Sequence, residues 1–391
     1  MQVMENNDFT YGVGLKSNKE TNDFLRCLWS RLAAKFGNLG WEYSPLKDGN
    51  SIHVGHAGLA DDILLNVNLS YKQRGCLKSI DFGPSGTFEQ ATLKRKLQQC
   101  VNEALHFDQY VLQKIYKGKL DKNLSFVRKA TESFVVEDNT IYLKVYGYDN
   151  QDCTSMFKAQ LQQVCNFLTY DSLRYITMSG TLTEEIRENH NFQTNLVDGY
   201  TGEVTETLEK NDMYRNLEVS DHMAEYINSY LQRPYGYEEH YTNFDKSVQF
   251  LAQGVRNEEL SKVAIGLPEP YVEQAIVNYM SALEVITLED REPELCEYCG
   301  QTKYSIARRV MDLAEHALSG GSTFAREYYN DRSRYMHTGT LFSSNSYVNR
   351  SIPLMSKNAR NGMLDQVPFV DGGLKEAIKA CIECHERKDL R

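Results

Sequence analysis

Residues 328–339 of the chain read YYNDRSRYMHTG. Aromatic and apolar residues recur there at three- and four-residue spacing, which predicts one amphipathic helix that ends at the glycine. At about 100° per residue, Phe324, Tyr328 and Tyr335 fall on one arc of this helix. Arg332 falls on the same arc. An arginine in an apolar arc needs a partner, because an unpaired buried charge is costly.

Glu284 is one candidate partner of Arg332. It likewise interrupts an apolar arc, on a helix that we predict over residues 269–288. His337 follows Arg332 by five residues and therefore lies roughly 140° around the helix from it. A regular helix does not bring these two side chains together. Their convergence would need either a frayed last turn or a second copy of the chain facing the first.

Length and composition indicate a two-domain globular protein. The chain has 391 residues, of which 41% are hydrophobic and 11% aromatic, enough for two cores of ordinary size. We expect a cytoplasmic protein without a membrane partner, because no apolar run is long enough for a membrane span and the first residues lack signal-peptide features. The nine cysteines are odd in number and mostly scattered, which argues against a disulfide framework.

Residues 1–212 are predicted to form a mixed α/β domain. Helical and strand-like periodicities alternate through this part of the chain. The predicted elements are helices over 21–36, 89–117 and 155–167, strands over 61–71, 76–83 and 174–180, and a hairpin over 134–148 that turns at Glu137-Asp138-Asn139. The polar, acidic stretch 181–212 is taken as a connecting region.

Residues 213–391 are predicted to form an all-α bundle, so that the whole chain has an α+β fold. The predicted helices cover 220–231, 244–256, 269–288, 303–318, 323–338 and 373–387. The last part of the bundle differs in charge from the rest of the chain. Residues 301–391 hold 14 basic and 10 acidic residues, whereas the net charge of the chain is −10. This sign change weakly favours a polyanionic partner.

Arg332-Ser333, followed by His337 at the end of a bundle helix, resembles the Arg-x(4–6)-His signature of HEPN domains. The upstream Leu-Glu pair that ends at Glu284 resembles the ApeA-type branch of that family, and the resemblance covers roughly residues 240–391. It implies a HEPN-like helical bundle and a dimeric, metal-independent endoribonuclease. Two motifs would face each other across the dimer and cleave single-stranded or loop RNA, leaving a 2′,3′-cyclic phosphate.

The resemblance also implies a role for each residue of the motif. His337 would act as general base or acid on the ribose 2′-hydroxyl and the leaving oxygen, and Arg332 would stabilise charge on the phosphate. Ser333 would orient the phosphate or the histidine. These residue types suit such chemistry, because histidine titrates near neutral pH and arginine offers a planar fork to phosphate. Supporting polar, charged and stacking groups are expected from Asn330, Arg334 and Tyr335.

In this family, such activity commonly serves antiviral defence or toxin–antitoxin function. Residues 1–212 would then be a sensor or regulatory domain, with a phage-derived trigger or an antitoxin as a possible partner. A second interpretation stays open. The bundle can instead be an inactive RNA- or nucleotide-binding module, or a dimerisation platform. In that case Arg332 pairs internally with Glu284, and His337 is an ordinary helix-end residue.

Two Cys-x-x-Cys units form a second candidate site. Cys296 and Cys299 precede a glycine, and Cys381 and Cys384 lie near the end of the chain. Together they can supply the four thiolates of a structural zinc site. Alternatively, Cys381 and Cys384 are two small buried residues one helical turn apart. We expect no cofactor for catalysis.

Overall fold

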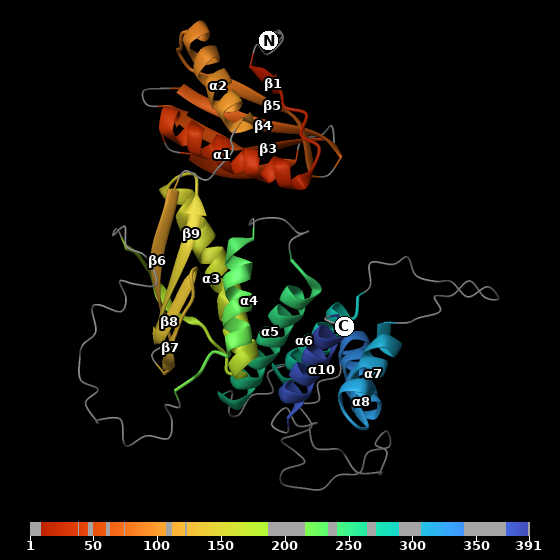
Figure 1. Ribbon diagram of the computed structural model, residues 1–391. Helices are drawn as coiled ribbons and strands as arrows, with labels where there is room; N and C mark the ends of the chain where they lie inside the picture. Colours follow the sequence, from red (N-terminus) through yellow and green to blue (C-terminus); the bar gives the residue numbers. More distant parts are fainter. Residues whose placement is uncertain are drawn as a thin grey trace, which may run out of the picture. The chain divides into compact units, whose positions relative to one another are not determined.

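The chain combines a strand-rich amino-terminal part with a helical carboxy-terminal part, as the predicted α+β class requires (Figure 1). The computed structural model describes residues 9–37, 39–45, 50–59, 63–73, 75–106, 112–121, 123–186, 216–233, 241–263, 271–288, 306–339 and 373–389. Within these residues, no helix is both long enough and apolar enough to cross a lipid bilayer.

The chain divides into two compact units. The first comprises residues 1–115, 144–158 and 233–240, and the second comprises residues 116–143, 159–232 and 241–391. The second unit thus contains strands as well as the helices. The predicted boundary between residues 212 and 213 lies outside the described residues and stays a prediction.

The first unit contains an antiparallel sheet with the strand order β1-β5-β4-β3-β2. Its strands are β1 (Thr10–Gly12), β2 (Leu39–Pro45), β3 (Ser51–Leu59), β4 (Ile63–Gln73) and β5 (Cys76–Ser85). The predicted alternation in β4 places Leu65, Val67 and Leu69 on one buried face. Helices α1 (Asn18–Phe36) and α2 (Gln90–Leu105) supply the other half of this hydrophobic core.

The helix predicted over residues 89–117 is confirmed over residues 90–105 and is wrong over residues 112–117. Helix α2 ends at Leu105, and strand β6 (Leu112–Leu120) follows. The physical reason is visible in the end of this strand, where Tyr116, Gly118 and Leu120 are buried and the lysines between them are not. A period of two is the periodicity of a strand.

The second sheet has the strand order β10-β6-β9-β8-β7. Its other strands are β7 (Phe126–Ala130), β8 (Phe134–Asp138), β9 (Thr140–Gly147) and β10 (Met178–Ile186). The predicted hairpin is confirmed, since β8 and β9 pair antiparallel around a turn where Asp138 has φ 50°. Helix α3 (Asn150–Ser172) packs against one face of this sheet, where Leu161 approaches Gly118.

The remaining helices match those predicted from the sequence. They are α4 (Asp221–Gln232), α5 (Asn243–Val263), α6 (Tyr271–Ile286), α7 (Ile306–Ala317), α8 (Gly321–Thr338) and α10 (Leu374–Asp389). An aromatic cluster joins α3 to two of them. The ring of Phe167 lies 5.3 Å from that of Tyr226, 5.1 Å from that of Tyr230 and 6.5 Å from that of Phe244. Helix α3, which packs on the second sheet, is therefore also part of the core of the helical part.

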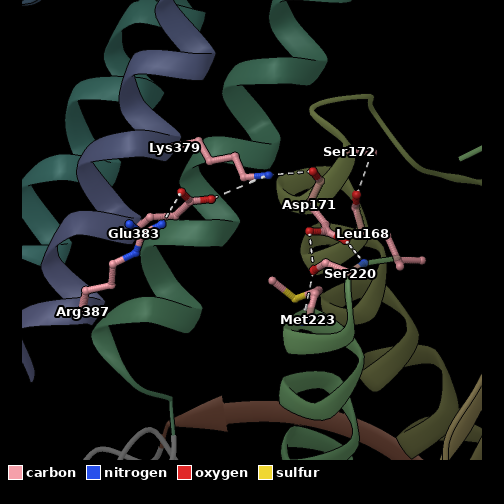
Figure 2. A network of polar contacts seen from close by, with 8 residues as sticks. All are labelled: Leu168, Asp171, Ser172, Ser220, Met223, Lys379, Glu383 and Arg387. Atoms are coloured by element: carbon pink, nitrogen blue, oxygen red, sulfur yellow. Dashed lines mark hydrogen bonds and ion pairs between the residues drawn. The ribbon is translucent and has the colours of Figure 1, made fainter. Parts of the chain in front are cut away.

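A polar network fixes α10 to the end of α3 (Figure 2). The Asp171 carboxylate accepts hydrogen bonds from the backbone N–H and the hydroxyl of Ser220, at 2.8 and 2.9 Å. Ser220 in turn caps the start of α4. From α10, the Lys379 ammonium donates to the Asp171 carbonyl oxygen at 2.7 Å and lies 5.2 Å from the centroid of the Tyr170 ring. Three segments distant in sequence meet at this point.

A buried carboxylate joins α5, α6 and α10. Glu258 is 1% exposed, and it accepts a hydrogen bond from the Tyr279 hydroxyl at 2.8 Å. Lys375 provides the counter-charge at 3.4 Å. Burial, together with the adjacent Glu258 charge, raises the pKa of Tyr279, so this hydroxyl stays a donor. Pairing makes the burial of Glu258 tolerable.

Gly254 on α5 lets Tyr279 pack closely, because a Cβ at this position would lie 2.3 Å from the tyrosine Cε1. We expect Gly254→Ala to lower the free energy of unfolding by about 1–3 kcal/mol, since the ring must shift. Urea denaturation measures this change. Gly12→Ala is the control, because no heavy atom lies within 4 Å of the added carbon. Equal stability of the two variants would contradict the close packing.

Candidate active site on helix α8

The α7–α8 hairpin determines where α8 begins. Gly320 has φ 77°, a left-handed conformation that favours glycine. A Cβ on Gly321 would lie 1.9 Å from the carbonyl oxygen of Ala314, so only glycine fits there. The Glu315 carboxylate accepts hydrogen bonds from the backbone N–H and the hydroxyl of Ser322, at 2.9 and 2.5 Å. These bonds lower the pKa of Glu315 and hold the start of α8 against α7.

Helix α8 stays regular up to its last residue, Thr338. The following residue, Gly339, is a left-handed cap with φ 66°, and its N–H donates to the Tyr335 carbonyl oxygen at 2.9 Å. The frayed last turn, one of the two expected routes to convergence, is not observed. In a regular helix, Arg332 and His337 remain on different sides. Within one chain, the two side chains do not converge.

The predicted partner of Arg332 is confirmed. Its Nη1 atom donates to Oε1 of Glu284, on α6, at 2.5 Å. The Tyr329 hydroxyl donates to the same oxygen at 2.9 Å, and the guanidinium carbon lies 5.6 Å from the Tyr329 ring centroid. Partial burial and the hydrogen bond to Glu284 raise the pKa of Tyr329. The Glu284 oxygen, with its two donors, therefore fixes the position of the Arg332 side chain relative to α6.

Arg332 is fixed without being fully enclosed. Its side chain is 22% exposed and that of Glu284 is 17% exposed. A guanidinium carries five N–H donors, and Glu284 accepts from Nη1. The Nε atom is buried, so a ligand would contact Arg332 through its Nη atoms, and the neighbouring carboxylate offsets part of the charge.

Four of the other motif residues, Asn330, Ser333, Arg334 and His337, are exposed on the outer part of α8. Tyr335 is half-buried and lies on the same arc as Arg332. Arg334 lies 3.6 Å from the Asp331 carboxylate, an exposed pair that contributes little to stability. The structure thus divides the predicted site into two parts, with the arginine held at the α6 interface and the histidine and serine open to a partner or ligand.

Only half of the predicted zinc site lies within the described residues. Cys381 is fully buried on α10, and Cys384 is half-buried one turn later. Burial raises the pKa of Cys381 to about 12, and the adjacent Cys384 adds to the effect. Such a thiol stays protonated at neutral pH unless a metal displaces the proton. Cys296 and Cys299 lie outside the described residues, so the four-cysteine site stays a prediction.

The described residues contain no cluster of three or more His, Cys, Asp or Glu side chains that could hold a metal ion. Sequence reasoning missed the buried Glu258, although the signal was present. Glu258 continues the three- and four-residue spacing of the buried positions in α5, such as Leu251 and Val255. This is the same interruption of an apolar arc that singled out Glu284 on α6.

Comparisons with known proteins do not identify this chain: no family model, no curated protein and no solved structure matches it. Functional inference therefore depends on the chemistry and geometry of the site and on the motif resemblance.

A double-mutant cycle tests the ion pair at the centre of the site. Glu284→Gln is expected to lower the free energy of unfolding by about 1–3 kcal/mol, because the partly buried guanidinium loses its counter-charge. Arg332→Met should remove most of this cost. We expect a coupling energy of at least about 0.5 kcal/mol between the two substitutions in urea denaturation. Strictly additive effects would show that the pair does not position α8.

Metal analysis tests the cysteine site. We expect the purified chain to carry about one zinc ion, as a closed tetrahedral thiolate site does. Cys384→Ser should release it, whereas Cys76→Ser, in the first unit, should not. Protein that contains no zinc and has free thiols at all four positions would exclude the site.

Proposed function

We propose that this protein is a metal-independent endoribonuclease of the HEPN type that acts as a homodimer. The observation that supports the proposal is the arrangement on α8. Glu284 and Tyr329 hold a partly exposed Arg332 in place, while His337 and Ser333 are exposed on the other side of the same regular helix. Because one chain keeps the arginine and the histidine apart, a complete site needs two copies with their α8 helices facing each other.

The proposed reaction is a transesterification within the RNA chain. One histidine accepts the proton of a ribose 2′-hydroxyl, and the 2′-oxygen attacks the adjacent phosphorus. The bond from phosphorus to the 5′-oxygen of the next nucleotide breaks, and the histidine, now protonated, donates this proton to that oxygen. The products are a 2′,3′-cyclic phosphate and a 5′-hydroxyl end. Arg332 stabilises the charge that develops on the phosphate.

The remaining motif residues have supporting roles in this proposal. Ser333 and Asn330 orient the phosphate or the histidine, and Arg334 adds positive charge. Tyr335 offers a ring on which an unpaired base can stack. A proton acceptor, a proton donor and a cation suffice for these steps, so we expect catalysis without a metal ion or another cofactor.

The biological setting is proposed from the motif resemblance alone. The enzyme would act in the cytoplasm, in antiphage defence or in a toxin–antitoxin pair. Residues 1–212 would respond to a phage-derived trigger or to an antitoxin.

One observation favours a second candidate function. The Glu284 carboxylate engages the same guanidinium that catalysis would use, as expected of an inactive HEPN-like module that binds RNA or a nucleotide or serves for dimerisation. A cleavage assay distinguishes the two candidates.

Substitution of the motif residues tests the nuclease. His337→Ala and Arg332→Ala should each reduce cleavage of a labelled single-stranded RNA by at least about 100-fold, because each removes a group that acts in the transition state. His316→Ala is the matched control, since His316 is an exposed histidine on the neighbouring helix α7. Excess chelator should leave the rate of the parent protein unchanged. Full activity of His337→Ala would exclude the assignment.

Cleavage by mixed dimers tests whether the site is formed by two chains. Co-expression of His337→Ala and Arg332→Ala chains gives mixed dimers in which one site can combine an intact arginine from one copy with an intact histidine from the other. Partial recovery of cleavage is expected from such mixtures. No recovery in verified mixed dimers would contradict a site that pairs Arg332 and His337 across the interface.

A further inference from the structure

The second sheet presents a basic and aromatic face that none of the motifs above uses. Strand β9 defines this face, because Tyr142, Lys144 and Tyr146 are all partly exposed. The residues that alternate with them, Leu143 and Val145, are fully buried. One side of the strand therefore packs into the interior, and the other side, the outer face, carries tyrosine, lysine and tyrosine in turn.

Strand β6, the hydrogen-bonded neighbour of β9, contributes lysines to the same face. Its residue Gly118 faces α3, so Lys117 and Lys119 on either side of it point to the opposite face. The Lys119 ammonium donates to the hydroxyl of Thr140 on β9 at 2.7 Å. Thr140 precedes Tyr142 by two residues and shares its side of the strand, which places Lys119 on the outer face.

The charge of this face is opposite to that of the chain. The outward residues of β6 and β9 include Lys117, Lys119 and Lys144. Next to them, Arg128 of β7 pairs with Glu137 of β8 at 3.4 Å, so these two charges offset each other. Counted by residue type, the described outward residues of strands β6 to β9 thus include more basic than acidic side chains, in a protein whose net charge is −10. A local surplus of this sign attracts a polyanion.

The two tyrosine rings on β9 favour a single-stranded nucleic acid over other polyanions. Proteins bind single strands of nucleic acid by stacking unpaired bases on aromatic side chains while basic side chains contact the backbone. Tyr142 and Tyr146 are four residues apart, about 14 Å along a strand. The Lys144 ammonium lies 5.9 Å from the Tyr146 ring centroid, so a cation and a stacking surface are presented together. A double helix would hide the bases that such rings contact.

We propose that the outer face of the second sheet binds single-stranded RNA. One base stacks on Tyr142 and another on Tyr146. Lys117, Lys119 and Lys144 contact the phosphates. The choice of RNA over DNA rests on the proposed function, whereas the binding itself does not need the residues of α8.

Fluorescence anisotropy with a labelled, unstructured single-stranded RNA tests the rings. The His337→Ala chain serves as the parent protein, so that cleavage does not interfere. Replacing Tyr142 and Tyr146 together with leucine should weaken binding by about tenfold or more, because base stacking is lost. Replacing both with phenylalanine should keep affinity within about twofold, since the rings remain. Tyr71→Leu, in the first sheet, is the matched control and should bind as the parent does.

The salt dependence of the same assay tests the lysines. Replacing Lys117, Lys119 and Lys144 with glutamine should reduce the slope of log affinity against log salt by about 2, because three phosphate contacts are lost. The matched control replaces three exposed lysines outside the second sheet, Lys72 on β4 and Lys94 and Lys96 on α2, with glutamine. It changes the net charge equally and should leave the slope unchanged. Circular dichroism and thermal melting verify the fold of every variant.

The proposal is overturned if the leucine variant binds RNA as tightly as its parent. It is also overturned if the control lysine variant reduces the slope of log affinity against log salt as much as the variant of Lys117, Lys119 and Lys144 does. Binding of single-stranded DNA without binding of RNA also overturns it. Its failure is distinct from a failure of the proposed function. If the chain with His337 restored cleaves RNA but the sheet variants bind RNA normally, the nuclease proposal stands and the sheet-face proposal is wrong. If the sheet variants lose binding but the chain with His337 does not cleave RNA, the sheet-face proposal stands and the nuclease proposal is wrong.

Discussion

The Glu284–Arg332 ion pair connects α6 to α8, and the candidate site takes its form from this contact. A guanidinium in an apolar arc is tolerable only beside a carboxylate, and Glu284 supplies one at 2.5 Å. The Tyr329 hydroxyl on the same oxygen restricts the pair further. The packing of α8 on α6 therefore sets the direction in which Arg332 can offer its remaining donors. It also determines that the opposite side of α8, with His337, is presented to solvent.

Helix regularity is the second constraint on function. Gly339 closes α8 with a left-handed cap, and the last turn keeps its hydrogen bonds. Five residues of regular helix separate Arg332 and His337 by roughly 140° around the axis. A site that uses both residues must then be assembled from two chains. The same ion pair is also compatible with an inactive module, because it engages the arginine internally.

The charged side chains of this protein are unevenly distributed. In an acidic chain, the outward residues of β6 and β9 include three lysines, and residues 301–391 hold more basic than acidic residues. Within the helical part, the buried Glu258 carboxylate is paired with Lys375 and accepts a hydrogen bond from the Tyr279 hydroxyl. Lys379 similarly joins α10 to the end of α3. Paired interior charges define the packing of the helices, and the surplus of positive charge remains at the surface.

Periodicity in the sequence determined the α+β class, the positions of the helices and the Glu284–Arg332 partnership. These features follow from local spacing, since side-chain direction repeats every 3.6 residues in a helix and every two in a strand. The helical prediction is wrong over residues 112–117, where strand β6 follows α2.

Tertiary structure alone decided which faces are presented. Spacing shows that Tyr142, Lys144 and Tyr146 share one side of a strand, but not that α3 covers the opposite side of the sheet or that Lys119 comes alongside. It also does not reveal that Lys379 donates a hydrogen bond to the Asp171 carbonyl oxygen across some 200 residues. Contacts of this kind depend on the packing of distant segments, which local periodicity does not encode.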